Sequence, residues 1–259
     1  EDLSVMRTLL LGSLLDVARY NAARDVEDLR LFETGATHLA RDEGLPDERR
    51  HVGALLVGRV RPESWRAADP SRVDFFAAKG VLAALLDSLR VDWDVEPAAE
   101  PFLHPGRAAA VAVGGERVGW VGELHPLVAR AWDLEDGAGC AAFELDLDAV
   151  ADAAAAAEAP RYREVTEFPP LRQDLAVVVA EDVPAAKLIG VVRAAAGPLL
   201  EAVQIFDVYR GPQVGEGRVS LALALVFRAS DRTLTDDEVQ ERREAIATAL
   251  EGFGGELRA

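Results

Sequence analysis

The sequence has a single cysteine, no long apolar run and no basic start, and each absence excludes a class of protein. Cys140 is alone, so no intramolecular disulfide can form and no thiolate metal site is indicated. No stretch approaches the roughly 18 apolar residues of a membrane-spanning helix, and the start, EDLSVMRTLL, lacks the basic region of a signal peptide. These features predict an intracellular, cytoplasmic protein with no membrane partner.

Side-chain patterns that indicate catalysis are also missing. The histidines lie far apart and lack metal-ligand spacing, and two of them, His104 and His125, precede prolines in segments expected to be turns. No serine lies in a nucleophile elbow, and no paired acid and base is evident. Gly114 and Gly115 separate two apolar runs as a hairpin turn does, rather than as a phosphate loop does. We therefore predict no catalytic residue and no metal site.

The charge is strongly acidic and unevenly distributed. The 259 residues carry a net charge of −17. Residues 1–159 hold 16 Lys and Arg against 29 Asp and Glu, whereas residues 160–259 hold 12 against 16. No basic stripe of the kind that dominates phosphate binding is present. Any nucleic acid is therefore expected to bind this chain alone only weakly.

The composition and one alanine-rich segment predict two domains. A chain of 259 residues, 50% of them hydrophobic, is long enough for two cores. In ADAAAAAEAPRYREV, a run of alanines that ends a helix starting near Leu147 is followed by a proline and a charged stretch. The boundary is expected near Pro160, with domains at 1–159 and 160–259.

The last hundred residues predict a strand-helix-strand-strand-helix-strand unit. The valine-rich run DLAVVVA is typical of a central strand, and AVQIFDVYRG and VSLALALVF flank a glycine-rich loop as the arms of a hairpin. A first helix is expected to start at Pro184 and to end at Gly197. Thr235 and Glu238 form a capping box before a second helix that ends near Gly252, and GELRA is long enough for a short last strand.

Alternation along the strands predicts an open face on this sheet. The large residues of VSLALALVF fall on one face and the small ones on the other, and Phe206 and Val208 are expected to join the large ones. Asp207, Tyr209 and Ser220 then lie on the open face. An open sheet with a ring and a few hydrogen-bonding groups is how several small domains hold unpaired bases. The alternative is an exposed tyrosine and aspartate with no role.

Three segments and one residue of this unit resemble a known family: FPPLRQDLAVVV, FDVYRG, Ser220 and RTLTDDEV, in that order and spacing. The unit resembles the ferredoxin-fold anticodon-binding domain that ends the β subunit of bacterial phenylalanyl-tRNA synthetase. The resemblance implies that the open face receives the tRNA anticodon stem-loop. The positions that match the family's contacts are Asp207, Tyr209, Ser220 and Arg258. It implies base stacking for the tyrosine, a cation near phosphate or base for the arginine, and hydrogen bonds from the other two.

The first domain resembles the catalytic-like domain of the same subunit. The matching segments, in order, are RLFETG, DFFAAKGVLAALLDSL, FLHPGRAAAV, GWVGELHPLVA and AAFELDLDAV. The resemblance implies an α+β chain: a class II synthetase-like antiparallel sheet with helices that has lost its catalytic residues, followed by a ferredoxin-like βαββαβ domain.

The resemblance also implies partners. The chain looks like the C-terminal fragment of a longer phenylalanine-tRNA ligase subunit, whose editing and OB-fold modules precede it. The expected partners are the catalytic α subunit, in an (αβ)₂ assembly, and tRNA(Phe). ATP and Mg are expected to serve the full complex, with no cofactor in this fragment, which alone is expected to be inactive.

Two other kinds of function stay open on the sequence alone. One is a regulatory small-molecule binder, since amino-acid-sensing domains share this strand and helix order. The other is an architectural protein without RNA contact, which the acidity permits. The cations available in the second domain are Arg161, Arg163, Arg172, Arg210, Arg218 and Arg258, and each can also be an ordinary surface residue. Arg7 and the following helix, with Leu10, Leu14, Val17 and Asn21 on one face, are expected to serve packing or an interface.

Overall fold

The computed structural model describes residues 5–61, 63–66, 71–134, 139–162 and 166–258. The chain divides into two compact units, Glu1–Pro160 and Arg161–Ala259. Each unit has its own sheet, and the buried apolar clusters each lie within one unit. None of the helices in the described ranges is both long and apolar enough to cross a membrane.

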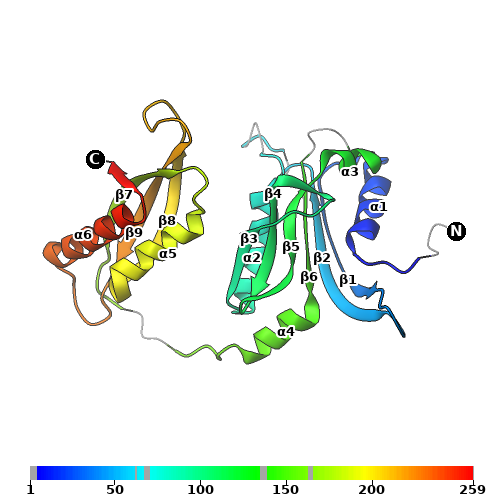
Figure 1. Ribbon diagram of the computed structural model, residues 1–259, viewed down its shortest axis with the longest axis horizontal. Coiled ribbons are helices and arrows are strands. Elements are labelled where there is room, and N and C mark those ends of the chain that lie inside the picture. Colours follow the sequence, from blue (N-terminus) through cyan, green and yellow to red (C-terminus); the bar gives the residue numbers. More distant parts are fainter. Residues whose placement is uncertain (1–4, 62, 67–70, 135–138, 163–165, 259) are drawn as a thin grey trace. The chain divides into compact units, whose positions relative to one another are not determined.

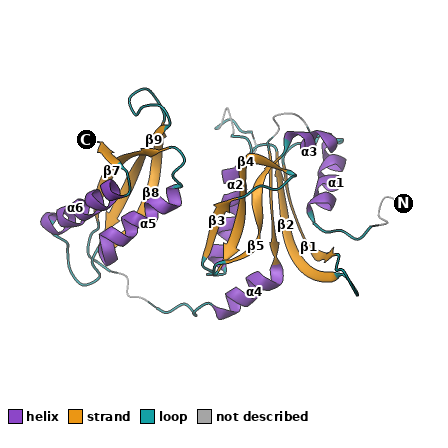
Figure 2. Cartoon of the chain, viewed as in Figure 1, coloured by secondary structure: helices purple, strands orange, loops and turns teal. Residues whose placement is uncertain are grey.

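The first unit is built on an antiparallel sheet between helices. Its described strands are β1 (Leu29–Leu39), β2 (Asp47–Val57), β3 (Trp93–Pro97), β4 (Leu103–Val113), β5 (Glu116–Leu124) and β6 (Cys140–Asp146), in the order β1-β2-β6-β5-β4-β3. Its described helices are α1 (Leu11–Ala22), α2 (Phe75–Ser88), α3 (Pro126–Ala131) and α4 (Leu147–Ala156). Figures 1 and 2 show α1 and α2 on opposite sides of this sheet.

The central strands of this sheet are apolar on both faces because helices cover both. In β2, Leu55 packs with α1, whereas Leu56, which points the other way, packs in the cluster of α2 and α4. The central residues of β6 are buried in the same way, and one of them is the acidic residue Glu144. The Gly114–Gly115 hairpin predicted from the sequence is confirmed: both glycines have positive φ and connect β4 to β5.

The second unit has the predicted βαββαβ order. Its elements are β7 (Leu171–Ala180), α5 (Ala185–Ala196), the short 3-10 turn η1 (Gly197–Leu199), β8 (Leu200–Tyr209), β9 (Arg218–Phe227), α6 (Asp236–Gly252) and β10 (Glu256–Arg258). The strands are antiparallel in the order β10-β7-β9-β8, which is a ferredoxin-like sheet. The fold class expected for this half of the chain is confirmed.

Both helices of this unit lie on one face of its sheet. Leu188 and Val192 of α5 and Ile246 of α6 are fully buried against Leu223 and the other large residues of β9. Figure 1 shows the two helices on the same side of the strands. The opposite face carries no helix among the described residues of the unit, so it is the open face that alternation predicts.

The structure differs from the sequence prediction at the edge strand β8. Phe206 and Val208 were expected to pack under the helices, but they are 56% and 44% exposed. Val208 is opposite the buried Leu221 and so keeps its predicted face, where it is exposed at the edge of the sheet. The register shifts between Ile205, which is opposite Leu223, and Asp207, which is opposite Ala222. Phe206 is therefore an extra residue in a β-bulge, and the bulge interrupts the simple alternation used in the prediction.

Three smaller expectations are also corrected. Pro184 is the N-cap of α5 rather than its first residue. His104 lies inside β4, beside an irregularity of register, whereas His125 is the N-cap of α3. In the α1 region Leu10 and Leu14 are buried as predicted, but Val17 is 46% exposed.

Candidate nucleic-acid interface

The register of the second sheet aligns the predicted site residues in two adjacent rows. One row crosses all four strands: Arg258 on β10, Ala176 on β7, Ala222 on β9 and Asp207 on β8 are each opposite the next. In the neighbouring row, Tyr209 of β8 is opposite Ser220 of β9. Residues directly opposite point to the same face, so all four predicted residues belong to the open face.

Tyr209 and Arg258 come together although their strands are the two edges of the sheet. Three strand spacings, roughly 14 Å, separate their backbones. The guanidinium carbon of Arg258 nevertheless lies 5.8 Å from the centre of the Tyr209 ring, within the range of a cation–π contact. The two side chains therefore lean toward each other across the sheet, above the small residues Ala176 and Ala222.

Ser220 and Asp207 differ in how accessible they are. Asp207 is exposed, and its carboxylate accepts a hydrogen bond from the Val208 N–H at 2.9 Å. Ser220 is on the open face as predicted but is only 6% exposed. Since Tyr209 is its direct neighbour across the β8–β9 pair, the hydroxyl belongs to the floor of the site rather than to its rim.

The loop between β8 and β9 contacts both of the approaching side chains. A Cβ at Gly211 would lie 2.4 Å from the Tyr209 hydroxyl, so the ring packs directly on this glycine. The amide oxygen of Gln213 accepts a hydrogen bond from the Arg258 guanidinium at 2.5 Å. The sequence prediction did not include Gln213, because nothing in a glycine-rich loop indicates that its polar residue reaches the last strand.

Two of the other predicted cations are paired with carboxylates. Arg210 pairs with Glu181 at 2.7 Å, and Arg218 pairs with Glu256 at 3.0 Å. These arginines and the loop glycines line a shallow depression of about 320 Å³. Arg172 is exposed on the open face of β7, and Arg163 lies outside the described residues. The site is thus polar, with little excess positive charge.

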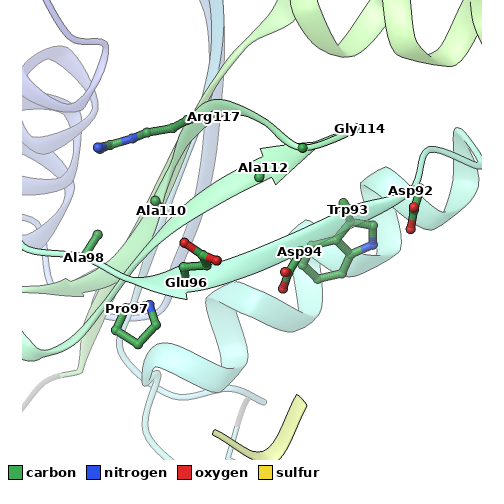
Figure 3. A pocket seen from close by; sticks show the side chains of 11 residues that line it. Asp92, Trp93, Asp94, Glu96, Pro97, Ala98, Ala110, Ala112, Gly114 and Arg117 are labelled. Carbon is green, nitrogen blue, oxygen red and sulfur yellow. The ribbon is translucent and has the colours of Figure 1, made fainter. Parts of the chain in front are cut away.

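The first unit has a larger depression, of about 570 Å³, at its β3 edge (Figure 3). Asp92, Asp94 and Glu96 line it from β3 and the residue before it, and Ala110 and Ala112 form its floor. Its arginine, Arg117, is paired with Glu100. Three carboxylates around one neutralised guanidinium repel the phosphates of a nucleotide, so this depression is not a candidate nucleotide site.

Cys140, at the start of β6, has no features of a reactive or metal-binding thiol. It is packed against the buried apolar cluster that includes α1, and burial raises the pKa of its thiol to about 12. In the described ranges no group of three or more His, Cys, Asp or Glu side chains is arranged to hold a metal ion. The thiol is protonated at neutral pH and behaves as a small strand residue.

An open ferredoxin-like sheet face that presents a ring and a guanidinium is the arrangement of a class of small domains that bind unpaired bases. Comparison with known families is consistent with this class. Residues 1–147 match the phenylalanyl tRNA synthetase beta chain CLM domain, and residues 166–258 match the ferredoxin-fold anticodon binding domain. The chain belongs to the phenylalanyl-tRNA synthetase β chain family.

Individual relatives match the chain along its whole length. It is 46% identical over 266 residues to the phenylalanine–tRNA ligase β subunit of Symbiobacterium thermophilum, 43% over 263 to that of Moorella thermoacetica and 38% over 262 to that of Geobacillus kaustophilus. These alignments cover 100% of this chain but only 29% to 32% of the relatives. The chain also matches a solved structure of Desulfitobacterium hafniense PylSc, a pyrrolysyl tRNA synthetase, at 12% identity and a TM-score of 0.41. That match covers 56% of the present chain and 48% of the PylSc chain.

Proposed function

We propose that this chain is the noncatalytic, anticodon-binding part of a phenylalanine-tRNA ligase β subunit, and that the open face of its second unit holds the anticodon stem-loop of tRNA(Phe). The observation that carries the proposal is the approach of Tyr209 and Arg258 over an alanine floor on an uncovered sheet face. The match of residues 166–258 to an anticodon-binding family supports it.

Each site residue has a role that its chemistry suits. The half-buried Tyr209 offers a ring on which an unpaired base can stack. Arg258 can contact a phosphate or stack on a base, and the exposed carboxylate of Asp207 can accept hydrogen bonds from base N–H groups. The small residues Ala176 and Ala222 leave room for a base to approach the sheet between the arginine and the aspartate.

For the first unit we propose a role in assembly with the catalytic α subunit, in an (αβ)₂ complex in the cytoplasm. Tyr20 of α1 is 60% exposed and Phe32 of the edge strand β1 is 77% exposed. Large exposed apolar side chains are typical of interaction surfaces. In this proposal the α subunit supplies the ATP- and Mg-dependent chemistry of charging tRNA with phenylalanine, and the present chain contributes structure and recognition.

A low-salt titration tests the RNA proposal. The chain is titrated with labelled tRNA(Phe) anticodon stem-loop and with a stem-loop of unrelated anticodon. Tyr209→Ala is expected to weaken binding to the first by about 1 to 3 kcal/mol, the stacking contribution of one base. Tyr162→Ala, which removes an 88% exposed ring outside the sheet, is the matched control.

The outcomes separate three functions. If the chain prefers the phenylalanine anticodon and Tyr209→Ala removes that preference, the result supports direct base recognition. No binding, together with unchanged charging activity of the complete ligase carrying Tyr209→Ala, would indicate an architectural role. Thermal stabilisation of the chain by free phenylalanine would indicate a regulatory small-molecule site if substitutions in the hairpin loop abolished it and Tyr209→Ala did not.

A further inference from the structure

The loop of residues 210–217 has a hydrogen-bonded turn and a buried side chain next to Gln213. The Val214 N–H donates to the Gly211 carbonyl at 3.1 Å, which closes a tight turn, and the Val214 side chain is only 6% exposed. Gln213 itself is exposed, but it lies between these two anchored positions. The backbone of Gln213 is therefore held by the turn and is not part of a free segment.

Arg258 needs an external partner to occupy a defined position. It is the last residue of the three-residue edge strand β10 and is exposed. A long arginine side chain at such a place has many rotamers, and fixing one costs free energy when a ligand binds. The hydrogen bond to Gln213 selects a position in which the guanidinium lies beside the Tyr209 ring.

We propose that Gln213 is a positioning residue for RNA binding, which acts through Arg258 by holding its guanidinium over the open face before the RNA arrives. The inference rests on the proposed function of that face. A neutral amide suits this role because it uses one of the five N–H donors of arginine and leaves its charge and remaining donors for the ligand. A carboxylate at position 213 would hold the arginine but would cancel its charge, as Glu181 does for Arg210.

A double-mutant cycle on the full 259-residue chain tests the proposal, with the tRNA(Phe) anticodon stem-loop as the probe. Gln213→Ala is expected to weaken binding roughly 3- to 10-fold, the usual effect of losing the preorganisation of one long side chain. In the Arg258→Ala background the same change is expected to have no further effect, because the residue on which Gln213 acts is absent. Gln240→Ala, on the exposed surface of α6, is the matched control and should leave binding unchanged.

The thermal unfolding midpoint is measured for every variant, and Gln213→Ala is expected to leave it unchanged. Equal effects of Gln213→Ala with and without Arg258 would overturn the inference, since Gln213 would then act independently. Tighter binding by Gln213→Ala would also overturn it, because the glutamine would be holding the arginine away from the RNA.

Failure of this inference is distinguishable from failure of the proposed function. If Tyr209→Ala and Arg258→Ala weaken binding but Gln213→Ala does not, the open face binds RNA and only the positioning role is wrong. If neither Tyr209→Ala nor Arg258→Ala changes binding, the proposed site itself is wrong, and the role of Gln213 fails with it.

Discussion

The Tyr209 ring packs on Gly211, two residues further along the chain, and this contact sets where the ring lies. The φ of Gly211 is not positive, so alanine could adopt the same backbone. Its Cβ, however, would lie 2.4 Å from the hydroxyl oxygen and 2.7 Å from the ring carbon that carries it. The glycine is needed for the close approach of a side chain and not for an unusual backbone conformation.

Gly211→Ala is therefore expected to displace the Tyr209 ring and to weaken binding of the anticodon stem-loop by about 1 kcal/mol, part of the stacking contribution of one base. The same titration measures it. Gly190→Ala is the control, because nothing lies within 4 Å of a Cβ at that position in α5. This control should leave binding unchanged and should stabilise the helix by about 0.5 to 1 kcal/mol. Unchanged binding by Gly211→Ala would mean that the ring position is not critical.

Glu144 is a single carboxylate in the middle of the first unit that joins three elements. It is 1% exposed on β6, accepts a hydrogen bond from the Leu10 N–H at 2.9 Å and lies 2.7 Å from Nδ1 of His51 on β2. Leu10 is the N-cap residue of α1, so the carboxylate ties the start of that helix to the sheet. The interface that we propose for α1 thus depends on a buried polar contact.

Glu144→Ala is expected to lower the free energy of unfolding of the first unit by about 3 kcal/mol, because it leaves a buried N–H and the imidazole without their partner. Urea denaturation measures the loss. Glu116→Ala, at the exposed start of β5, is the control and should change stability by less than about 0.5 kcal/mol. A comparable loss in both variants would contradict a specific role for the buried carboxylate.

At the scale of whole elements, α6 begins with the capping box that its sequence predicts. The Thr235 side chain accepts from the Glu238 N–H, and the Glu238 carboxylate accepts from the Thr235 N–H at 3.0 Å. The Thr235 N–H bond, and then the positive charge of Arg232, lower the pKa of Glu238 below its ordinary value of 4.5. Because the folded pKa is lower than the unfolded one, this carboxylate stabilises the fold above pH 4.5 and loses that effect as the pH falls through the folded value.

Thr235→Ala is expected to cost about 1 kcal/mol of stability at neutral pH, the usual effect of removing an N-cap side chain. Glu238→Gln is expected to be less stable than the wild-type chain at pH 7 and to approach it in stability at pH 3. Denaturation of the second unit at the two pH values measures both effects, and Glu241→Gln, one turn later on the exposed side, is the control. A difference between wild type and Glu238→Gln that grew at low pH would contradict the assigned sign.

The elements of the second unit could be predicted because each carries a local signal. The capping box placed α6, Gly197 with its positive φ ended α5, and alternation in β9 identified the packed face. The bulge at Phe206 could not be predicted, since one extra residue depends on pairing with β9 rather than on β8 itself. The Gln213 contact was missed for the same reason: its partner Arg258 lies 45 residues away.

At the scale of the whole molecule, most of the net negative charge lies in residues 1–159, outside the domain of the proposed RNA-binding face. The proposed RNA-binding face lies in residues 160–259, which hold 12 Lys and Arg against 16 Asp and Glu. The described cations near its loop are largely paired, so little counterion release is available to drive binding. Affinity for RNA is therefore expected near the weak range of about 10⁻⁴ to 10⁻⁶ M until other parts of a complete ligase contribute further contacts.

The separate cores predict two independent unfolding transitions. Leu223 is fully buried in the cluster of the second unit, and Leu82 is fully buried in the cluster of the first. Leu223→Ala is expected to cost its own unit about 2 to 5 kcal/mol, because it removes apolar contacts and leaves a cavity. For a domain of this size such a loss lowers the unfolding midpoint by roughly 10 °C or more.

Scanning calorimetry of the wild-type chain, Leu223→Ala and Leu82→Ala measures whether the transitions are separate. Each substitution should shift one transition and leave the other in place, because a cavity in one cluster removes no contact from the other. A simultaneous shift of both transitions would show that the two units unfold as one cooperative body. In that case a core defect in the first unit would also weaken RNA binding by the second, and the effects of Tyr209→Ala and Arg258→Ala would have to be compared at equal stability.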